Sequence, residues 1–312
     1  FKNSVLIADQ CKDIELKFPD QIINFPHLLH PLNYDSSSKE DLTWRIAKEY
    51  GRLPLDNKEY FDRFVYEMNS VTKNKRINLI DYFLVLEDLC RWCRENGVMV
   101  GPGRGSGAGS LINYALKITH LDPIKYKLLF ERFISTGRIE NGTLPDVDLD
   151  FSDPEKARQY LIEKYGDDRV IRIGTFQTLQ TAGSIKDIMK STHPEIDFMA
   201  VNKITSSMGK RDLEETEVEF FERNLEENDL VKTFFSKYPE VQRKVEKLIG
   251  YNRQSGVHPC GLAITQDPIF NFAPLRKIKG KSVLEFNAPS CEQSGIIKYD
   301  ILSLNTLNYI QR

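Results

Sequence analysis

Three aspartates alternate with apolar residues in the segment PDVDLDF at residues 145–151. In an extended strand, residues two apart point to the same side, so Asp146, Asp148 and Asp150 would line one face. Three carboxylates so close together repel one another unless a cation lies between them. Their hard oxygen atoms favour Mg²⁺ or Mn²⁺. The spacing therefore predicts a divalent-metal site, with a polar strand edge or a capped loop as the alternative.

Glycines dominate a second segment, GPGRGSGAGS at residues 101–110. We expect a short buried strand before it, at residues 98–100, and a helix after it, at residues 111–116. Such a strand–turn–helix unit gathers backbone N–H groups where no side chain obstructs them, and those groups can bind an anion. The segment is not a P-loop, because no Lys-Ser or Lys-Thr pair follows the glycines. A flexible turn is the alternative to an anion site.

Polar groups within the glycine segment favour the anion site. Arg104 adds a permanent, forked positive charge, and Ser106 and Ser110 add hydroxyl donors. Gly103 and Gly105 leave their backbone N–H groups unobstructed. Together with the acidic segment, these donors predict that a triphosphate is held here while divalent ions bridge it to the carboxylates.

Several segments of the chain resemble, in the same order, the catalytic palm of the bacterial replicative DNA polymerase III alpha subunit. They are GPGRGSGAGS (101–110), DPIKYKLLFERF (122–133), PDVDLDF (145–151), RQSGVHPCGLAI (253–264) and IIKYDILSL (296–304). The resemblance implies an α+β fold, in which a nucleotidyltransferase-like palm has a mixed β-sheet flanked by helices and carries an inserted helical thumb.

The same resemblance implies a division of the chain into domains. Residues 36–178 and 253–312 would form the catalytic palm, and residues 179–252 the helical thumb that grips duplex DNA. The thumb assignment agrees with an almost wholly helical, charged pattern between those bounds. Residues 1–35 would be a connector from an amino-terminal domain that this sequence does not contain.

In that family, the first two aspartates of the acidic strand and one distant aspartate bind the metal ions. These match Asp146, Asp148 and Asp300, whereas spacing alone leaves the pairs Asp146/Asp148 and Asp148/Asp150 equally open. Asp150 would then support the site or end the strand. Two Mg²⁺ ions, about 3.5–4 Å apart in such sites, would activate a primer 3′-hydroxyl and hold the phosphates of a dNTP; Mn²⁺ could replace them.

Three further residues are candidates for the same site. Lys298 and Asp300 alternate in a strand-like run and should face one way, so Lys298 could neutralise a phosphate, or form a salt bridge at a strand edge. His258 is either a structural histidine or, by the resemblance, a neighbour of the active site. Arg132 is expected to order a carboxylate through an ion pair, or to contact the catalytic centre.

Composition is consistent with these expectations but does not establish them. The chain has 312 residues, 40% apolar and 28% charged, with a net charge of −2, which is ordinary for a soluble globular protein. No stretch is apolar enough to span a bilayer and no signal peptide is visible, so we expect a cytoplasmic protein without membrane contact. Five cysteines without a disulfide pattern fit a reducing compartment. Cys90 and Cys93 should pack in a helical core.

The combined prediction is template-directed DNA synthesis, with nucleotidyl transfer from a dNTP to a primer 3′-hydroxyl and release of pyrophosphate. Expected partners are primer–template DNA, dNTP, the remaining polymerase chain with its fingers and C-terminal domains, and, through those parts, a sliding clamp and the replisome. Because only twelve residues follow Asp300, the fingers would be absent, and such a fragment could be inactive alone. A metal-dependent phosphohydrolase or nuclease and a non-catalytic replisome assembly piece are the alternatives.

Overall fold

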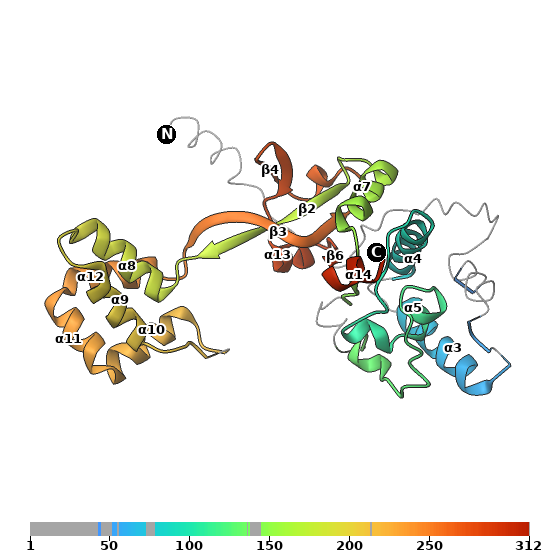
Figure 1. Cartoon of the computed structure of the whole chain (residues 1–312), viewed down its shortest axis with the longest axis horizontal. Coiled ribbons are helices and arrows are strands. Elements are labelled where there is room, and N and C mark those ends of the chain that lie inside the picture. Colours follow the sequence, from blue (N-terminus) through green and yellow to red (C-terminus); the bar gives the residue numbers. More distant parts are fainter. Residues whose placement is uncertain are drawn as a thin grey trace, which may run out of the picture. The chain divides into compact units, whose positions relative to one another are not determined.

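The computed structural model describes most of the chain from residue 79 onward (Figure 1). The described residues are 43–44, 52–54, 56–72, 79–135, 137, 145–212 and 214–311. The connector predicted at residues 1–35 lies outside them. The chain divides into two compact units. Unit 1 combines the residues up to Gly174 with those from Val257 onward, and unit 2 is Thr175–Gly256.

A mixed six-stranded sheet with the strand order β1-β6-β3-β2-β5-β4 is the centre of unit 1. Its strands are β1 (Asp148–Phe151), β2 (Val170–Thr178), β3 (Asn252–Ile264), β4 (Leu275–Ile278), β5 (Lys281–Leu284) and β6 (Lys298–Ser303). β1 pairs in parallel with β6, and β2 with β5, whereas β3 with β6 and β4 with β5 are antiparallel. The mixed sheet and its flanking helices confirm the predicted α+β class.

Helices accompany this sheet in unit 1, and some of them contact it at β1 and β6. They are α3 (Lys58–Thr72), α4 (Ile80–Glu95), α5 (Leu111–Ala115), α7 (Pro154–Tyr165), α13 (Ala288–Gln293) and α14 (Asn305–Gln311), with the short 3₁₀ turns η1 (Ser106–Gly109), η2 (Phe130–Arg132) and η3 (Ile269–Asn271). The carboxylate of Asp153 accepts a hydrogen bond from the Lys156 N–H at 3.0 Å and caps α7, and Pro154 occupies its first turn.

Helix α4 is enclosed by other elements along most of its length. Phe83, Val85 and Leu89 are fully buried, and so are the acidic Glu87 and Asp88. Cys90 and Cys93 lie in this helix, buried and free of disulfides, so the prediction that they pack in the core is confirmed.

The strand predicted at residues 98–100 is wrong. Val100 forms only an isolated antiparallel bridge with Phe151. The Gly101 N–H still donates to the Asp150 carbonyl at 2.8 Å, but Pro102, which follows, has no N–H to continue a ladder. The pairing therefore stops after one bridge, yet it fixes the start of the glycine segment against β1.

Unit 2 is a cluster of short helices with its own apolar core. The helices are α8 (Thr181–Thr192), α9 (Phe198–Ser207), α10 (Glu217–Glu227), α11 (Asp229–Lys237) and α12 (Pro239–Leu248). Phe221 and Phe235 meet edge to face in the core, with ring centroids 5.4 Å apart. A capping box between Thr216 and Glu219 begins α10. The predicted helical content of residues 179–252 is thus confirmed, and its role as a thumb stays a prediction.

Candidate metal and nucleotide site

Two of the predicted metal ligands meet because β1 and β6 pair in parallel. Their register places Asp148 directly beside Asp300. Val147 and Leu149, which alternate with the acids, are each 1% exposed and pack into the core. The alternation predicted for the acidic segment is therefore present, although Asp146 lies just before β1 rather than within it.

Asp146, Asp148 and Asp300 form a three-carboxylate cluster. Each offers an oxygen atom, and these atoms lie within 4.8 Å of one another. Oδ1 of Asp300 is buried and has no hydrogen-bond partner among the residues that the structure describes. A buried carboxylate oxygen without a donor is costly unless a cation satisfies it. The donor set, which consists only of hard oxygens, fits Mg²⁺ or Mn²⁺.

Lys298 lies between two of these carboxylates. Its Nζ is 2.9 Å from Oδ2 of Asp146 and 2.8 Å from Oδ2 of Asp300. Burial alone would lower the pKa of Lys298, but the hydrogen bonds to both acids raise it above its ordinary value. Burial also raises the pKa of Asp146, with a further contribution from the charge of Asp300, while Lys298 opposes the shift. Lys298 thus stays protonated at neutral pH.

The glycine segment lies directly against the acidic strand. A Cβ built on Gly105 would be 3.0 Å from Oδ2 of Asp148, and one on Gly101 would be 3.0 Å from the Cβ of Asp150. Arg104 places Nε 3.7 Å from Oδ2 of Asp148 and Nη1 3.5 Å from Oδ1 of Asp150. Only glycine backbone can approach the carboxylates so closely, so the two predicted halves of the site are adjacent.

Asp150 is separate from the three-carboxylate cluster. Its side chain is 8% exposed and pairs with Arg104. Burial raises the pKa of Asp150, the charge of Arg104 opposes that shift, and Asp148 adds to it. The role of Asp150 as a supporting residue of the site stays a prediction.

A cavity of about 220 Å³ opens beside the glycine segment. Its lining includes Gly105, Ser106, Lys127 and Arg132, so two cationic side chains flank the proposed phosphate-binding turn. Gly103 has a φ of +106°, and a Cβ there would come within 2.8 Å of the Thr119 side chain. Ser106 and Arg132 thus line one cavity with Gly105, whereas Gly103 lies against Thr119.

Two of the secondary candidates have hydrogen-bond partners within the fold. Ser110 is fully buried, and its hydroxyl donates to Glu67 at 3.0 Å rather than facing the turn. This corrects the prediction that Ser110 donates to a ligand. Its hydroxyl instead bonds α3 to the glycine segment through Glu67. His258 Nδ1 accepts the Gly261 N–H at 2.7 Å. It closes a turn within β3 just before Gly261, the residue that pairs with Asp300.

The structure also reveals contributors that the sequence reasoning missed. The buried hydroxyl of Tyr82 accepts the Val147 N–H at 3.0 Å and so fixes the chain between two metal-site acids. Glu67 occupies a core position of α3, in step with Phe64, Met68 and Val71. An acid at the apolar spacing of a helix was the available signal. Tyr82 had no comparable signal, because it looks like any core tyrosine.

An α+β fold with a mixed sheet, a carboxylate cluster at paired strands and an adjacent glycine turn is consistent with a metal-dependent nucleotidyltransferase. Residues 38–303 match the family model described as the bacterial DNA polymerase III alpha NTPase domain. The chain therefore belongs to the bacterial DNA polymerase III alpha family.

Curated relatives support this membership along nearly the whole chain. The DNA polymerase III subunit alpha of Borreliella burgdorferi is 34% identical over 99% of this chain and 26% of its own length. That of Staphylococcus aureus is 34% identical over 98% of the chain and 28% of its own length. The subunit of Thermus aquaticus is 36% identical over 87% of this chain and 22% of its own length. The chain thus spans about a quarter of the length of these relatives.

Proposed function

We propose that this chain provides the catalytic centre of a DNA polymerase, which transfers a nucleotidyl group from a dNTP to a primer 3′-hydroxyl. The observation that carries the proposal is the register of β1 and β6. It brings Asp300 beside Asp148, within a cluster that also contains Asp146, and directly against the glycine turn at Gly105. Carboxylates and phosphate-binding amides side by side are what a metal–triphosphate complex requires.

Each residue has a defined part in this proposal. Asp146, Asp148 and Asp300 hold divalent ions, which when bound supply the positive charge that favours hydroxyl ionisation and leaving of pyrophosphate. Arg104 and the backbone N–H groups of residues 103–106 bind the triphosphate. Lys298 keeps its proton and adds fixed positive charge beside the carboxylates, so that the site stabilises developing negative charge without rearrangement.

We assign unit 2 the role of a thumb that contacts primer–template DNA. Exposed lysines occur on its helices, at Lys190 and Lys203, whereas α10 is rich in glutamate and should face water. Phosphate contacts through such lysines would weaken as salt is added. A sliding clamp and the other replisome proteins would bind the polymerase through parts other than these two units, and a reducing cytoplasmic setting is expected.

Replacement of a metal ligand tests the proposal. Asp148→Asn keeps the size of the side chain but removes its charge. We expect it to weaken Mn²⁺ binding, measured by electron paramagnetic resonance, by more than the roughly tenfold typical of losing a supporting partner. We also expect it to abolish nucleotide incorporation by the polymerase to which this chain contributes.

The matched control is Asp62→Asn, which changes an exposed acid on α3. It should bind Mn²⁺ as the wild type does. Unchanged Mn²⁺ affinity and incorporation in Asp148→Asn would contradict the proposed function. Release of labelled phosphate or cleavage of DNA without any incorporation would point to a phosphohydrolase or nuclease instead.

A further inference from the structure

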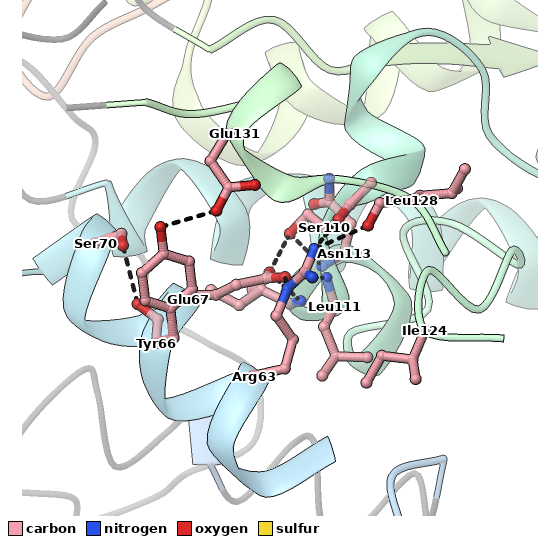
Figure 2. A network of polar contacts seen from close by, with 12 residues as sticks. Arg63, Tyr66, Glu67, Ser70, Ser110, Leu111, Asn113, Ile124, Leu128 and Glu131 are labelled. Carbon is pink, nitrogen blue, oxygen red and sulfur yellow. Dashed lines mark hydrogen bonds and ion pairs between the residues drawn. The ribbon is translucent and has the colours of Figure 1, made fainter. Parts of the chain in front are cut away.

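A carboxylate outside the metal site is fully buried in unit 1. Glu67 lies on α3 and is 0% exposed, and Figure 2 shows the polar network around it. Its Oε1 accepts the Leu111 N–H at 3.0 Å, and its Oε2 accepts the Ile112 N–H at 3.1 Å and the Ser110 hydroxyl at 3.0 Å. One side chain thus satisfies the first donors of α5, which a helix leaves without partners of its own.

Arg63, one turn earlier on α3, extends this contact to the glycine segment. Its Nε donates to Oε1 of Glu67 at 2.7 Å. Its Nη2 donates to the carbonyl of Gly109 at 3.0 Å and to that of Leu128 at 3.2 Å. The guanidinium therefore joins the carboxylate to the last glycine of the segment, and to Leu128, which lines the neighbouring cavity. Figure 2 shows Arg63 between Glu67 and Leu128.

The glycine segment is consequently held on one side by α3 and faces the metal cluster on the other. Asn113 adds a hydrogen bond from its Nδ2 to the Gly107 carbonyl at 2.9 Å. Four residues before Gly109, Gly105 lies against Asp148. A Cβ on Gly109 would come within 2.7 Å of the Leu129 carbonyl, so this end of the segment has little freedom to move.

Burying an ion pair is costly, and apolar side chains could fill the same space at less expense. Burial raises the pKa of Glu67, while the hydrogen bonds from Leu111 and Arg63 lower it. Stability alone is therefore a weak reason for this network. Its contacts instead converge on the backbone of residues 109–112, which directly follows the proposed phosphate-binding turn.

We propose that Glu67 and Arg63 are positioning residues for the nucleotide, which hold the glycine segment so that its amides face the triphosphate beside the metal cluster. Neither residue touches the ligand; both act through the backbone. This inference rests on the proposed function, because it assumes that the turn binds the phosphates of a dNTP. Preorganised donors are worth more than mobile ones, because binding then costs no ordering.

Two substitutions in the chain test it. Glu67→Gln replaces one carboxylate oxygen by an NH₂ group, which cannot accept the hydrogen bonds from the Ser110 hydroxyl and the Ile112 N–H. Arg63→Lys keeps a positive charge but loses the second arm that reaches the Gly109 carbonyl. We expect Glu67→Gln to raise the Kd of dNTP in the presence of Mn²⁺ about tenfold, equivalent to ~1.4 kcal/mol. Arg63→Lys should raise it about threefold.

Two further readouts separate positioning from general loss of stability. The affinity for Mn²⁺ alone should change by less than about twofold, because the hydrogen bonds of Glu67 and Arg63 go to residues 109–112 and 128 and not to the metal ligands. Hydrogen exchange of the amides in residues 103–112 should become faster. The matched control is Asp88→Asn, another fully buried acid. Its carboxylate accepts hydrogen bonds from Arg91 and Tyr160, at 2.7 Å each, and from Lys164, rather than from the glycine segment.

Asp88→Asn should lower the melting temperature but leave the dNTP Kd and the exchange of residues 103–112 unchanged. Wild-type dNTP affinity and exchange in Glu67→Gln would overturn the inference, as would an equal loss of dNTP affinity in Asp88→Asn. If Glu67→Gln does not fold, Arg63→Lys decides by the same readouts. If the wild type binds Mn²⁺ but no dNTP, the proposed function fails, and the exchange rates alone decide whether α3 positions the segment.

Discussion

At the scale of single residues, charge balance defines the site. Four carboxylates gather there, at Asp146, Asp148, Asp150 and Asp300, against the cationic side chains of Lys298 and Arg104. When all are ionised, the formal charge is −2, which one divalent cation would neutralise. Oδ1 of Asp300, which has no hydrogen-bond partner in the described part of the chain, adds a position at which such a cation would replace a missing donor.

Gly105 is the residue on which contact between the two halves of the site depends. Its φ of +64° and ψ of −153° belong to a region that is almost restricted to glycine. Gly105→Ala should therefore destabilise unit 1 by about 1–3 kcal/mol. It should also weaken Mn²⁺ binding, because the added methyl group would displace Asp148. Thermal unfolding and Mn²⁺ titration measure the two effects.

Gly183→Ala is the matched control for that substitution. A Cβ at Gly183, inside α8, would meet nothing within 4 Å. The replacement should stabilise the helix by roughly 0.5–1 kcal/mol, because glycine loses more conformational freedom on folding than alanine does. Equal destabilisation by both substitutions would contradict the importance of the close approach at Gly105.

At the scale of elements, one strand pair and one helix contact position the chemistry. The pairing of β1 with β6 sets the carboxylate cluster, and α3 holds the glycine segment through Glu67. In unit 2, His193 at the end of α8 links that helix to α12, because its Nε2 lies 2.8 Å from Oε1 of Glu240. Each of these three contacts between elements is thus made by hydrogen bonds.

The link through His193 makes the stability of unit 2 depend on pH. The hydrogen bond to Glu240 raises the pKa of His193, with a smaller contribution from Glu195. Because the pKa of His193 is higher in the folded state, its ion pair stabilises the folded state fully below the unfolded pKa of about 6.5. This stabilisation is lost as pH rises through the folded pKa. The wild type should therefore have a higher melting temperature than His193→Gln at about pH 6, and this difference in melting temperature should be smaller at about pH 8.5.

Differential scanning calorimetry of the two proteins measures this difference. Using the difference between them cancels the titration of other groups, because those groups are the same in both. A difference in melting temperature that grows as pH rises would contradict the assignment.

At the scale of the whole molecule, the proposed chemistry belongs to one unit and the proposed grip on DNA to the other. All the proposed metal ligands lie in unit 1. The ends of the helical part of unit 2 close on each other, since the Leu179 N–H donates to the Tyr251 carbonyl at 2.8 Å and the Gly250 N–H to the Leu179 carbonyl at 2.9 Å. No helix of the described residues is long and apolar enough to cross a membrane.

This closure allows the helical part to be removed. Replacing residues 180–249 by an Asn-Gly turn should leave a hairpin between β2 and β3. We expect the Mn²⁺ affinity to stay within about twofold of the wild type, since all the proposed metal ligands belong to unit 1. Affinity for primer–template DNA, measured by fluorescence anisotropy, should fall and lose part of its salt dependence. Loss of Mn²⁺ binding, or full retention of DNA binding, would contradict the division of roles.

The sequence by itself determined what depends on neighbouring residues. Asp153 and Pro154 begin α7, the spacing of apolar residues predicts the helices of unit 2, and alternation buries Val147 and Leu149 behind the acids, because caps and periodicity are local properties. Spacing did not choose among the acids, and it wrongly predicted a strand before Gly101, where a single bridge forms.

The family resemblance implied that Asp300 joins Asp146 and Asp148, but only the tertiary structure shows how distant groups meet. The register of β1 and β6 brings Asp300 to Asp148, and strand pairing between remote segments leaves no local pattern to read. The Ser110 hydroxyl donates to Glu67 because α3 packs against the glycine segment. Which side chains are buried depends on such contacts with another element, and the local sequence does not show them. Local sequence thus specified the elements and the acids, whereas long-range packing determined which of their polar groups face the site.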